Sequence, residues 1–221
     1  AIAVAARDLV FPATLGRICA APCETGCRRG LYDRPLPIRA LHGQLAEEHA
    51  GMAIAPEPLP PTGKAVAIAG GGMAGLAAAA VCLRLGHACH VYEKEPAACP
   101  RVRQLPPEQL PSRVLDAEVK AILDMGAELR PGCLVGRDVT PDSLLADYDA
   151  VIVACGAPFP AAPNVFHARE HAMPVRSVAL GKAAAQNADA FLREGLREGL
   201  REGPEAGAGK RFNSQIGKLR P

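Results

Sequence analysis

The sequence predicts an α/β fold, and three observations within residues 64–95 support this prediction. A short apolar strand around Ile68 leads directly into the glycine-rich turn Gly70–Gly75. An alanine- and leucine-rich helix follows this turn and ends near Leu85. A second strand over Ala88–Tyr92 comes next. A strand, a glycine turn, a helix and a second strand in this order are typical of a Rossmann-like dinucleotide-binding unit.

The glycine turn follows the pattern GxGxxG, and each glycine has a physical role in it. Gly70 permits a tight turn, Gly72 lets the backbone approach a pyrophosphate, and Gly75 allows the helix to pack closely on the strand. The start of the helix offers unpaired backbone amides to an anion. Glu93 follows the second strand, where an acidic residue can accept hydrogen bonds from ribose hydroxyls.

Composition excludes several classes of function. The 221 residues carry a formal net charge of +2, contain no Trp and are only 4% aromatic, which argues against a nucleic-acid-binding protein that stacks bases. No apolar run is long enough to span a membrane. The first residues do not resemble a secretory signal. Eight cysteines without such a signal indicate a reducing, cytoplasmic location and favour metal or cluster ligation over disulfides.

Three of these cysteines are clustered near the start of the chain. Cys19, Cys23 and Cys27 follow a Cys-x3-Cys-x3-Cys spacing. Thiolates in such a cluster are the ligands that iron–sulfur centres require. Zinc is an alternative, although its usual Cys-x2-Cys spacing is absent. Three reduced structural thiols are the other alternative.

The remaining elements follow in order along the chain. We expect helices where apolar residues recur at helical spacing and strands where β-branched residues run together. The expected elements are a helix over Ile38–His49, a proline-rich linker over Ala50–Gly63, a helix over Arg113–Met125, strands over Glu128–Leu134 and Tyr148–Ala154, a last strand at Val165–Phe166, a helix over Ser177–Phe191, and a tail with three LREG repeats and a basic end, Arg211–Pro221.

Two blocks of sequence resemble a known family. They are FPATLGRICAAPCETGCRRG with PLPIRALH, and GKAVAIAGGGMAGLAAA with LGHACHVYEKE. On these residues the chain resembles the glutamate synthase small-subunit family, which is related to the amino-terminal region of dihydropyrimidine dehydrogenase. The resemblance covers residues 11–192. Members of the family join a helical iron–sulfur module to an FAD domain and an NAD(P)H domain, and they pass electrons through FAD and the clusters to a partner catalytic unit.

The resemblance implies two cofactors, FAD and a [4Fe-4S] cluster. It implies cluster ligation by Cys19, Cys23 and Cys27, with His42 near the position where relatives place a fourth ligand. The residues that it implies for FAD binding are Gly70, Gly72, Met73, Ala74, Gly75, Glu93, Lys94, Ala154 and Gly156.

The chain also departs from the family. Only a short loop between Ala157 and Asn164 stands where relatives carry the NAD(P)H domain, and no second GxGxxG follows. The first cysteine block of the family is absent as well. We therefore expect a truncated member that does not oxidise NAD(P)H directly. The stretch Ala97–Pro100 stands where relatives have a Gly-Gly turn beside the flavin. Glu170 stands close to the position at which relatives have an aspartate that helps to hold FAD.

These observations predict a Rossmann-like FAD-binding domain preceded by a small helical, cysteine-rich iron–sulfur module. The expected parts are the module (residues 1–50), a linker (51–63), the FAD-binding domain without an inserted NAD(P)H domain (64–192) and a tail that contacts a partner (193–221). The predicted function is electron transfer between FAD and the cluster, within a complex with a larger catalytic or iron–sulfur subunit. The alternatives are a degenerate, non-redox structural subunit and a stand-alone NAD-dependent dehydrogenase, which would lack a catalytic acid or base.

Overall fold

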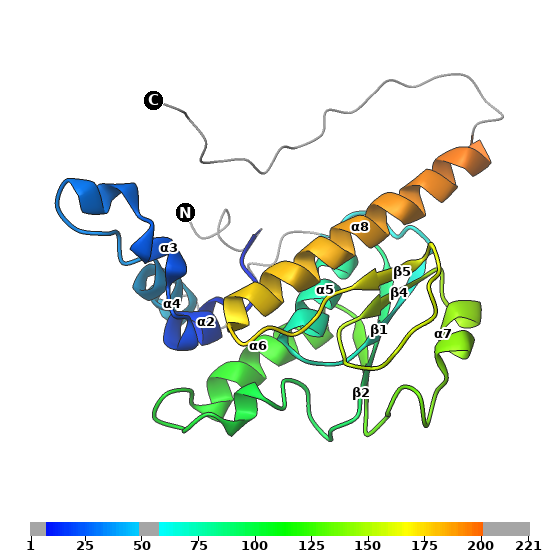
Figure 1. Ribbon diagram of the computed structural model, residues 1–221, viewed down its shortest axis with the longest axis horizontal. Coiled ribbons are helices and arrows are strands. Elements are labelled where there is room, and N and C mark those ends of the chain that lie inside the picture. The colour runs from blue at the N-terminus through cyan, green and yellow to red at the C-terminus, as the bar shows by residue number, and fades with distance from the viewer. Residues whose placement is uncertain (1–7, 49–57, 201–221) are drawn as a thin grey trace.

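The computed structural model describes residues 8–48 and 58–200 and confirms the α/β prediction (Figure 1). Five strands form one sheet in the order β3-β2-β1-β4-β5, and every neighbouring pair is parallel, as in a Rossmann-like domain. The strands are β1 (Ala65–Ala69), β2 (Ala88–Glu93), β3 (Ala127–Pro131), β4 (Ala150–Val153) and β5 (Val165–His167).

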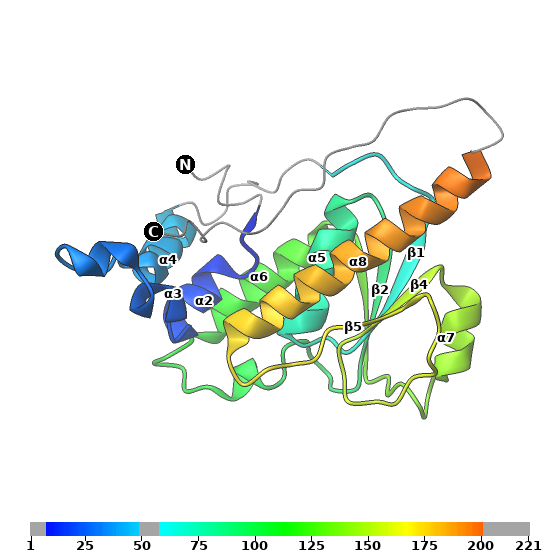
Figure 2. The ribbon, with the colours of Figure 1, turned by 45° about the horizontal axis from the view of Figure 1, so that its top comes forward.

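Helices cover the two faces of the sheet unequally (Figure 2). Helices α5, α6 and α8 lie on one face and α7 lies on the other. Alternate residues of β1 point to opposite faces, so Ile68 belongs to the larger core and Ala67 to the smaller one. The helices of this domain are α5 (Met73–Arg84), η2 (Val102–Gln104), α6 (Ser112–Asp124), α7 (Pro141–Asp147) and α8 (Pro174–Leu200).

Helix α5 is buried on all sides because it lies between the sheet and α8. Its alanines let the two helices approach closely. At the crossing, Gly181 of α8 lies so near Ala74 that a Cβ on Gly181 would overlap the Ala74 carbonyl oxygen. Helix α5 ends where predicted, and Gly86 takes the expected left-handed conformation with φ +88°.

The cysteine-rich segment is helical and packs against the Rossmann-like domain. It contains α2 (Pro12–Ile18), α3 (Pro22–Thr25), η1 (Arg28–Leu31) and α4 (Ile38–Glu48). Gly16 of α2 lies against Gly43 of α4, where a Cβ on Gly16 would be 2.5 Å from the Gly43 Cα. Phe11, Leu15 and Cys19 join the same hydrophobic core as α5 and α6.

Several expected boundaries differ from the observed ones, most of all those of α8 and β3. Helix α8 begins at Pro174 and continues beyond Phe191 to Leu200, because glycine weakens a helix interior by only about 1 kcal/mol and does not stop it. Strand β3 ends at Pro131, before Gly132 with φ +70°. Most of the expected linker and the basic tail lie outside the described residues. No helix in the described part of the chain is long and apolar enough to cross a membrane.

One carboxylate joins the cysteine-rich segment to the Rossmann-like domain. Glu118 of α6 accepts hydrogen bonds from the backbone N–H groups of Ala13, at 2.7 Å, and Thr14, at 2.9 Å. These N–H groups belong to the first turn of α2 and have no partner within that helix. Glu118 therefore caps α2 from a helix of the neighbouring domain. Burial raises the pKa of the Glu118 carboxyl above its ordinary value of 4.5, although the Thr14 and Ala13 contacts lower it.

The pKa shift of Glu118 predicts a pH-dependent contribution to stability. A carboxyl whose pKa is raised on folding stabilises the protein most below the unfolded pKa, and this contribution is lost as pH rises through the folded pKa. We expect the free energy of unfolding of the wild type, minus that of Glu118→Gln, to fall as pH rises from the ordinary carboxyl pKa of 4.5 through the raised pKa of Glu118. Urea unfolding across this range measures the difference, and a difference that rises with pH would contradict the assignment.

Candidate functional site

The glycine turn between β1 and α5 brings the backbone close to β4. Gly70 has φ +111°, and a Cβ on it would lie 2.8 Å from the carbonyl oxygen of Ala154. A Cβ on Gly75 would overlap the carbonyl oxygen of Gly70 and would lie 3.3 Å from the Ile68 side chain. Both positions therefore require glycine for steric reasons. The turn places the start of α5 at the carboxyl edge of the sheet, where ligands bind in open α/β folds.

Glu93 fastens this turn to the end of β2. Its side chain is buried, and Oε2 accepts a hydrogen bond from Gly71 N at 2.8 Å while Oε1 accepts one from Glu95 N at 2.9 Å. Both carboxylate oxygens thus hold the backbone next to the turn. Lys94 points away from this arrangement and forms an exposed pair with Glu95 at 3.7 Å.

The end of β4 forms the opposite side of the site. Ala154 is buried and donates its N–H to the Ala69 carbonyl oxygen at 2.8 Å, which places it directly beside the glycine turn. Gly156 follows and is exposed, with no heavy atom within 4 Å of the position that a Cβ would occupy. This edge of the site is therefore open.

The turn Ala97–Pro100 lies against the glycine turn and takes the left-handed conformation at Cys99 rather than at proline. Cys99 has φ +55°, and its N–H donates to the Gly71 carbonyl oxygen at 2.8 Å. The positive φ that glycine provides more easily is thus retained one residue before Pro100. Burial, and then the charge of Glu170, raises the pKa of the Cys99 thiol to about 12, so this thiol stays protonated near neutral pH.

The start of α5 has an interaction that the sequence pattern did not predict. Ala74 N donates a hydrogen bond to Glu170 Oε1 at 2.9 Å. The other carboxylate oxygen, Oε2, accepts one from the Ser177 hydroxyl at 3.1 Å. Glu170 was expected near the cofactor through the family resemblance alone, and nothing in the local sequence signals its contact with a residue 96 positions away.

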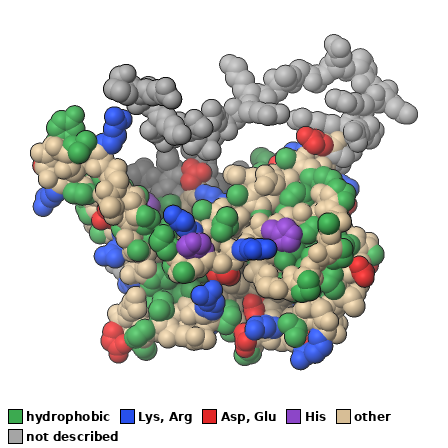
Figure 3. Space-filling view, in the orientation of Figure 1, with side chains coloured by type: hydrophobic (Ala, Val, Ile, Leu, Met, Phe, Trp, Pro, Cys, Tyr) green, Lys and Arg blue, Asp and Glu red, His purple; other side chains and the backbone are tan. Residues whose placement is uncertain are grey.

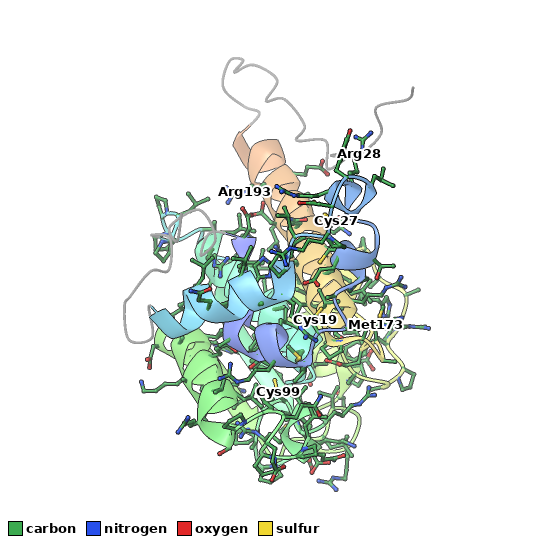
Figure 4. All side chains as sticks on the ribbon, turned by 90° about the vertical axis from the view of Figure 1, so that its left-hand side faces the viewer. Cys19, Cys27, Arg28, Cys99, Met173 and Arg193 are labelled. Atoms are coloured by element: carbon green, nitrogen blue, oxygen red, sulfur yellow. The ribbon has the colours of Figure 1, made fainter. Side chains whose placement is uncertain are left out.

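The three clustered cysteines lie in different environments. Cys19 is buried, and its sulfur accepts a hydrogen bond from Ala21 N at 3.3 Å. Cys23 is exposed and Cys27 is half-buried. Figure 4 shows Cys27 toward the outer end of the helical segment, apart from Cys19. Hydrogen bonds from the backbone amides of Leu36, Arg29 and Gly30 lower the pKa of Cys27.

These side chains do not converge on a common point. His42 is half-buried on α4. Within residues 8–48 and 58–200, no group of three or more His, Cys, Asp or Glu side chains is arranged to hold a metal ion. All eight cysteines are free thiols. The arrangement of the described residues does not fit an assembled iron–sulfur cluster, although backbone amides already point at two of the sulfurs.

Comparisons with known proteins relate the chain to oxidoreductases. The family described as "Alanine dehydrogenase/PNT, C-terminal domain" matches residues 42–185. The glutamate synthase [NADPH] small chain of Mycobacterium tuberculosis is 38% identical over 151 residues, which cover 66% of this chain and 31% of that protein. The NADP(+)-dependent formate dehydrogenase subunit beta of Moorella thermoacetica is 35% identical over 179 residues, covering 70% of this chain and 25% of that protein.

A third relative is also matched over only part of its length. The NADPH-Fe(3+) oxidoreductase subunit beta of Geobacter sulfurreducens is 32% identical over 155 residues, covering 68% of this chain and 23% of that protein. Among solved structures, Mycobacterium tuberculosis FprA in complex with NADPH is 27% identical, with a TM-score of 0.39, over 45% of this chain and 23% of that one.

The chain thus spans less than a third of the length of each of these relatives. Its parallel sheet and glycine turn lie within residues 42–185, the part that matches the family. The chain belongs to the alanine dehydrogenase/PNT C-terminal domain family, and it is related to subunits of electron-transferring oxidoreductases.

Proposed function

We propose that this chain is an electron-transfer subunit of an oxidoreductase complex and that it binds FAD at the start of α5. The observation that carries the proposal is the glycine turn, which brings Gly70 and Gly75 into backbone contact and places the start of α5 at the carboxyl edge of the sheet. Amides at a helix N-terminus bind a pyrophosphate through hydrogen bonds and the helix dipole. The relatives named above, from glutamate synthase to formate dehydrogenase, support a redox role.

The residues at this site have the chemistry to hold FAD. The backbone at Gly72, Met73 and Ala74 would face the pyrophosphate. Gly70, Gly75 and Glu93 would fix the turn and the end of β2 beside the adenosine, with Lys94 exposed next to them, while Ala154 and Gly156 line the edge formed by β4. The bound flavin would supply the electron chemistry, and the chain would supply its position and surroundings.

The iron–sulfur part of the proposal is the ligand set Cys19, Cys23, Cys27 and His42. The described arrangement does not fit an assembled cluster, so binding would require these side chains to converge. No step of electron transfer is assigned to a cluster on this basis. Iron and acid-labile sulfide content decides the matter: Cys23→Ser should lower both if the ligand set is correct, and unchanged iron would reject it.

We further propose a larger catalytic or iron–sulfur subunit as the partner. The outer end of the cysteine-rich segment exposes Leu31, at 84%, and Tyr32, at 91%, next to Arg28 and Arg29. Figure 3 shows apolar and basic side chains together at this end. Exposed aromatic residues beside arginine are typical of protein interfaces. This proposal also includes the division of the chain into module, linker, FAD-binding domain and partner-binding tail. It includes a cytoplasmic location as well.

A non-redox structural subunit is the second candidate function. It is favoured by the contacts that already use the site, since Glu93 binds the backbone and Glu170 binds Ala74. The two functions differ in the visible spectrum of the purified protein. Flavin absorbance at about 450 nm would support the redox subunit. Failure of the protein to take up FAD on reconstitution would support the structural subunit.

The substitution Gly72→Val tests the assigned pyrophosphate site. The three atoms nearest to a Cβ at Gly72 would be side-chain atoms of Glu170 and not backbone, so Glu170 would have to shift, and circular dichroism checks that the variant folds. Its branched side chain would keep a pyrophosphate away from the α5 amides, and we expect the bound flavin to fall at least about tenfold. Flavin content after reconstitution is the measurement. Ala146→Val, at an exposed position of α7, is the matched control. Equal flavin content in Gly72→Val and the control would reject the site.

A further inference from the structure

The carboxylate of Glu170 lies at the N-terminal end of α5, within the proposed site. Its Oε1 accepts the hydrogen bond from Ala74 N at 2.9 Å, and a Cβ on Gly72 would overlap the same oxygen. Gly72 and Ala74 are two of the residues that would face a pyrophosphate. A negatively charged group of the chain itself therefore stands where the diphosphate of a dinucleotide would accept the same N–H.

The turn between β5 and α8 holds this carboxylate in place. Ser177 is fully buried, and its hydroxyl lies 3.1 Å from Glu170 Oε2 while it accepts a hydrogen bond from His171 N at 2.8 Å. Met173 N in turn donates to His171 Nδ1 at 2.9 Å, and Figure 4 shows Met173 at the start of α8. These contacts fix the position of the Glu170 side chain, which is therefore not free on the surface.

The packing of α8 on α5 also fixes the position of Ala74, the residue that Glu170 contacts. Gly181 lies against the carbonyl oxygen of Ala74, the residue whose N–H binds Glu170. The first turn of α5 is therefore held against α8 around Ala74. A carboxylate and a diphosphate compete for one helix N-terminus because both are stabilised by its unpaired N–H groups and by the positive end of its dipole.

We propose that Glu170 closes the anion-binding end of α5 in cis, and that a dinucleotide binds only by displacing this carboxylate. The inference rests on the proposed function, since it concerns the same site. Under it, Glu170 sets the affinity of the chain for any ligand that carries a diphosphate. Removing the Glu170 charge should therefore strengthen dinucleotide binding. If the carboxylate instead accepted hydrogen bonds from the hydroxyl groups of the cofactor, removing it would weaken binding.

Titration of the full chain with three probes tests this proposal. FAD and ADP both carry a diphosphate, and riboflavin does not. We expect Glu170→Gln to tighten FAD and ADP at least about tenfold, equivalent to about 1.4 kcal/mol, and to leave riboflavin unchanged. Glu170→Ala, which also removes the bulk of the side chain, should tighten both at least as much. Isothermal titration calorimetry gives the affinities, and circular dichroism checks the fold.

A matched control separates this local effect from a change in net charge. Glu194 is exposed on α8 and lies about 25 Å along the helix from Ser177, at roughly 1.5 Å per residue. Glu194→Gln removes the same charge and should leave all three affinities within about twofold of the wild type, because a charge at this distance is screened.

The outcomes distinguish the inference from the proposed function. Weaker FAD binding by Glu170→Gln would make the carboxylate a ligand of the cofactor and overturn the inference while the function stands. Equal FAD binding by wild type, Glu170→Gln and Glu170→Ala would also overturn it alone. Failure of every variant to bind FAD or ADP would remove the proposed function and the inference together.

Discussion

Gly75→Ala is expected to destabilise the fold by about 3 kcal/mol, the upper end of the usual range for overpacking. A Cβ at this position would overlap the carbonyl oxygen of Gly70 and would lie 3.0 Å from the Gly70 carbonyl carbon. Neither is the end of a flexible side chain, so β1 and α5 would have to move apart. In an unconstrained helix the same substitution would stabilise the protein by about 1 kcal/mol, so even the sign of the effect tests the packing.

The comparison with Gly156→Ala makes this experiment specific. Gly156 has no heavy atom within 4 Å of its Cβ position and does not have a positive φ. Its replacement should change the free energy of unfolding by no more than about 0.5 kcal/mol. Urea unfolding of both variants, followed by circular dichroism, gives the two values. A loss below about 1 kcal/mol for Gly75→Ala would show that the turn does not approach α5 as described.

Asp189→Ala is expected to cost about 3 kcal/mol, because it removes the acceptor shared by the buried His87 and the partly exposed Arg193. The side chain of His87 is fully buried, with Nε2 2.9 Å from Asp189 Oδ1 and Nδ1 2.7 Å from the Thr62 hydroxyl. Arg193 Nε also donates to Asp189 Oδ1, at 2.7 Å, and another of its nitrogens donates to the Leu85 carbonyl oxygen at 3.1 Å. The network fastens α8 to the end of α5, and Figure 4 marks Arg193 on α8.

The exposed pair of Lys120 and Asp124 on α6 provides the control. These side chains lie 2.6 Å apart, with exposed fractions of 73% and 61%, so Asp124→Ala should cost less than about 1 kcal/mol. A double-mutant cycle of His87→Ala and Asp189→Ala isolates the coupling energy of the buried pair. We expect a coupling above about 1 kcal/mol, and additive single effects would refute the shared role of Asp189.

Local sequence predicted the central unit of the fold well. The strand around Ile68, the turn Gly70–Gly75 and the stop at Gly86 all follow from patterns that lie within about 30 contiguous residues. The helix Ser112–Asp124 was predicted to within one residue for the same reason. Such elements depend on the spacing of apolar side chains and on the conformational freedom of glycine, and both can be read directly from the chain.

The site was less predictable, because its contacts join distant segments. Glu170 reaches Ala74, and Glu118 reaches Ala13, across separations of 96 and 105 residues. The spacing of Cys19, Cys23 and Cys27 gives their order along the chain and says nothing about the direction of each sulfur. One sulfur is buried in the core shared with α5, and Cys23 is exposed.

By itself, the sequence determined that a strand, a glycine turn and a helix would form a dinucleotide-type unit, since short-range sterics and hydrophobic periodicity are properties of neighbouring residues. Only the tertiary structure decided which carboxylate lies at the start of α5. That choice depends on the packing of α8 against α5 at Gly181, which brings the turn holding Glu170 within hydrogen-bonding distance of Ala74. The physical reason is that a hydrogen bond requires two groups within about 3 Å, and chain order does not encode that distance.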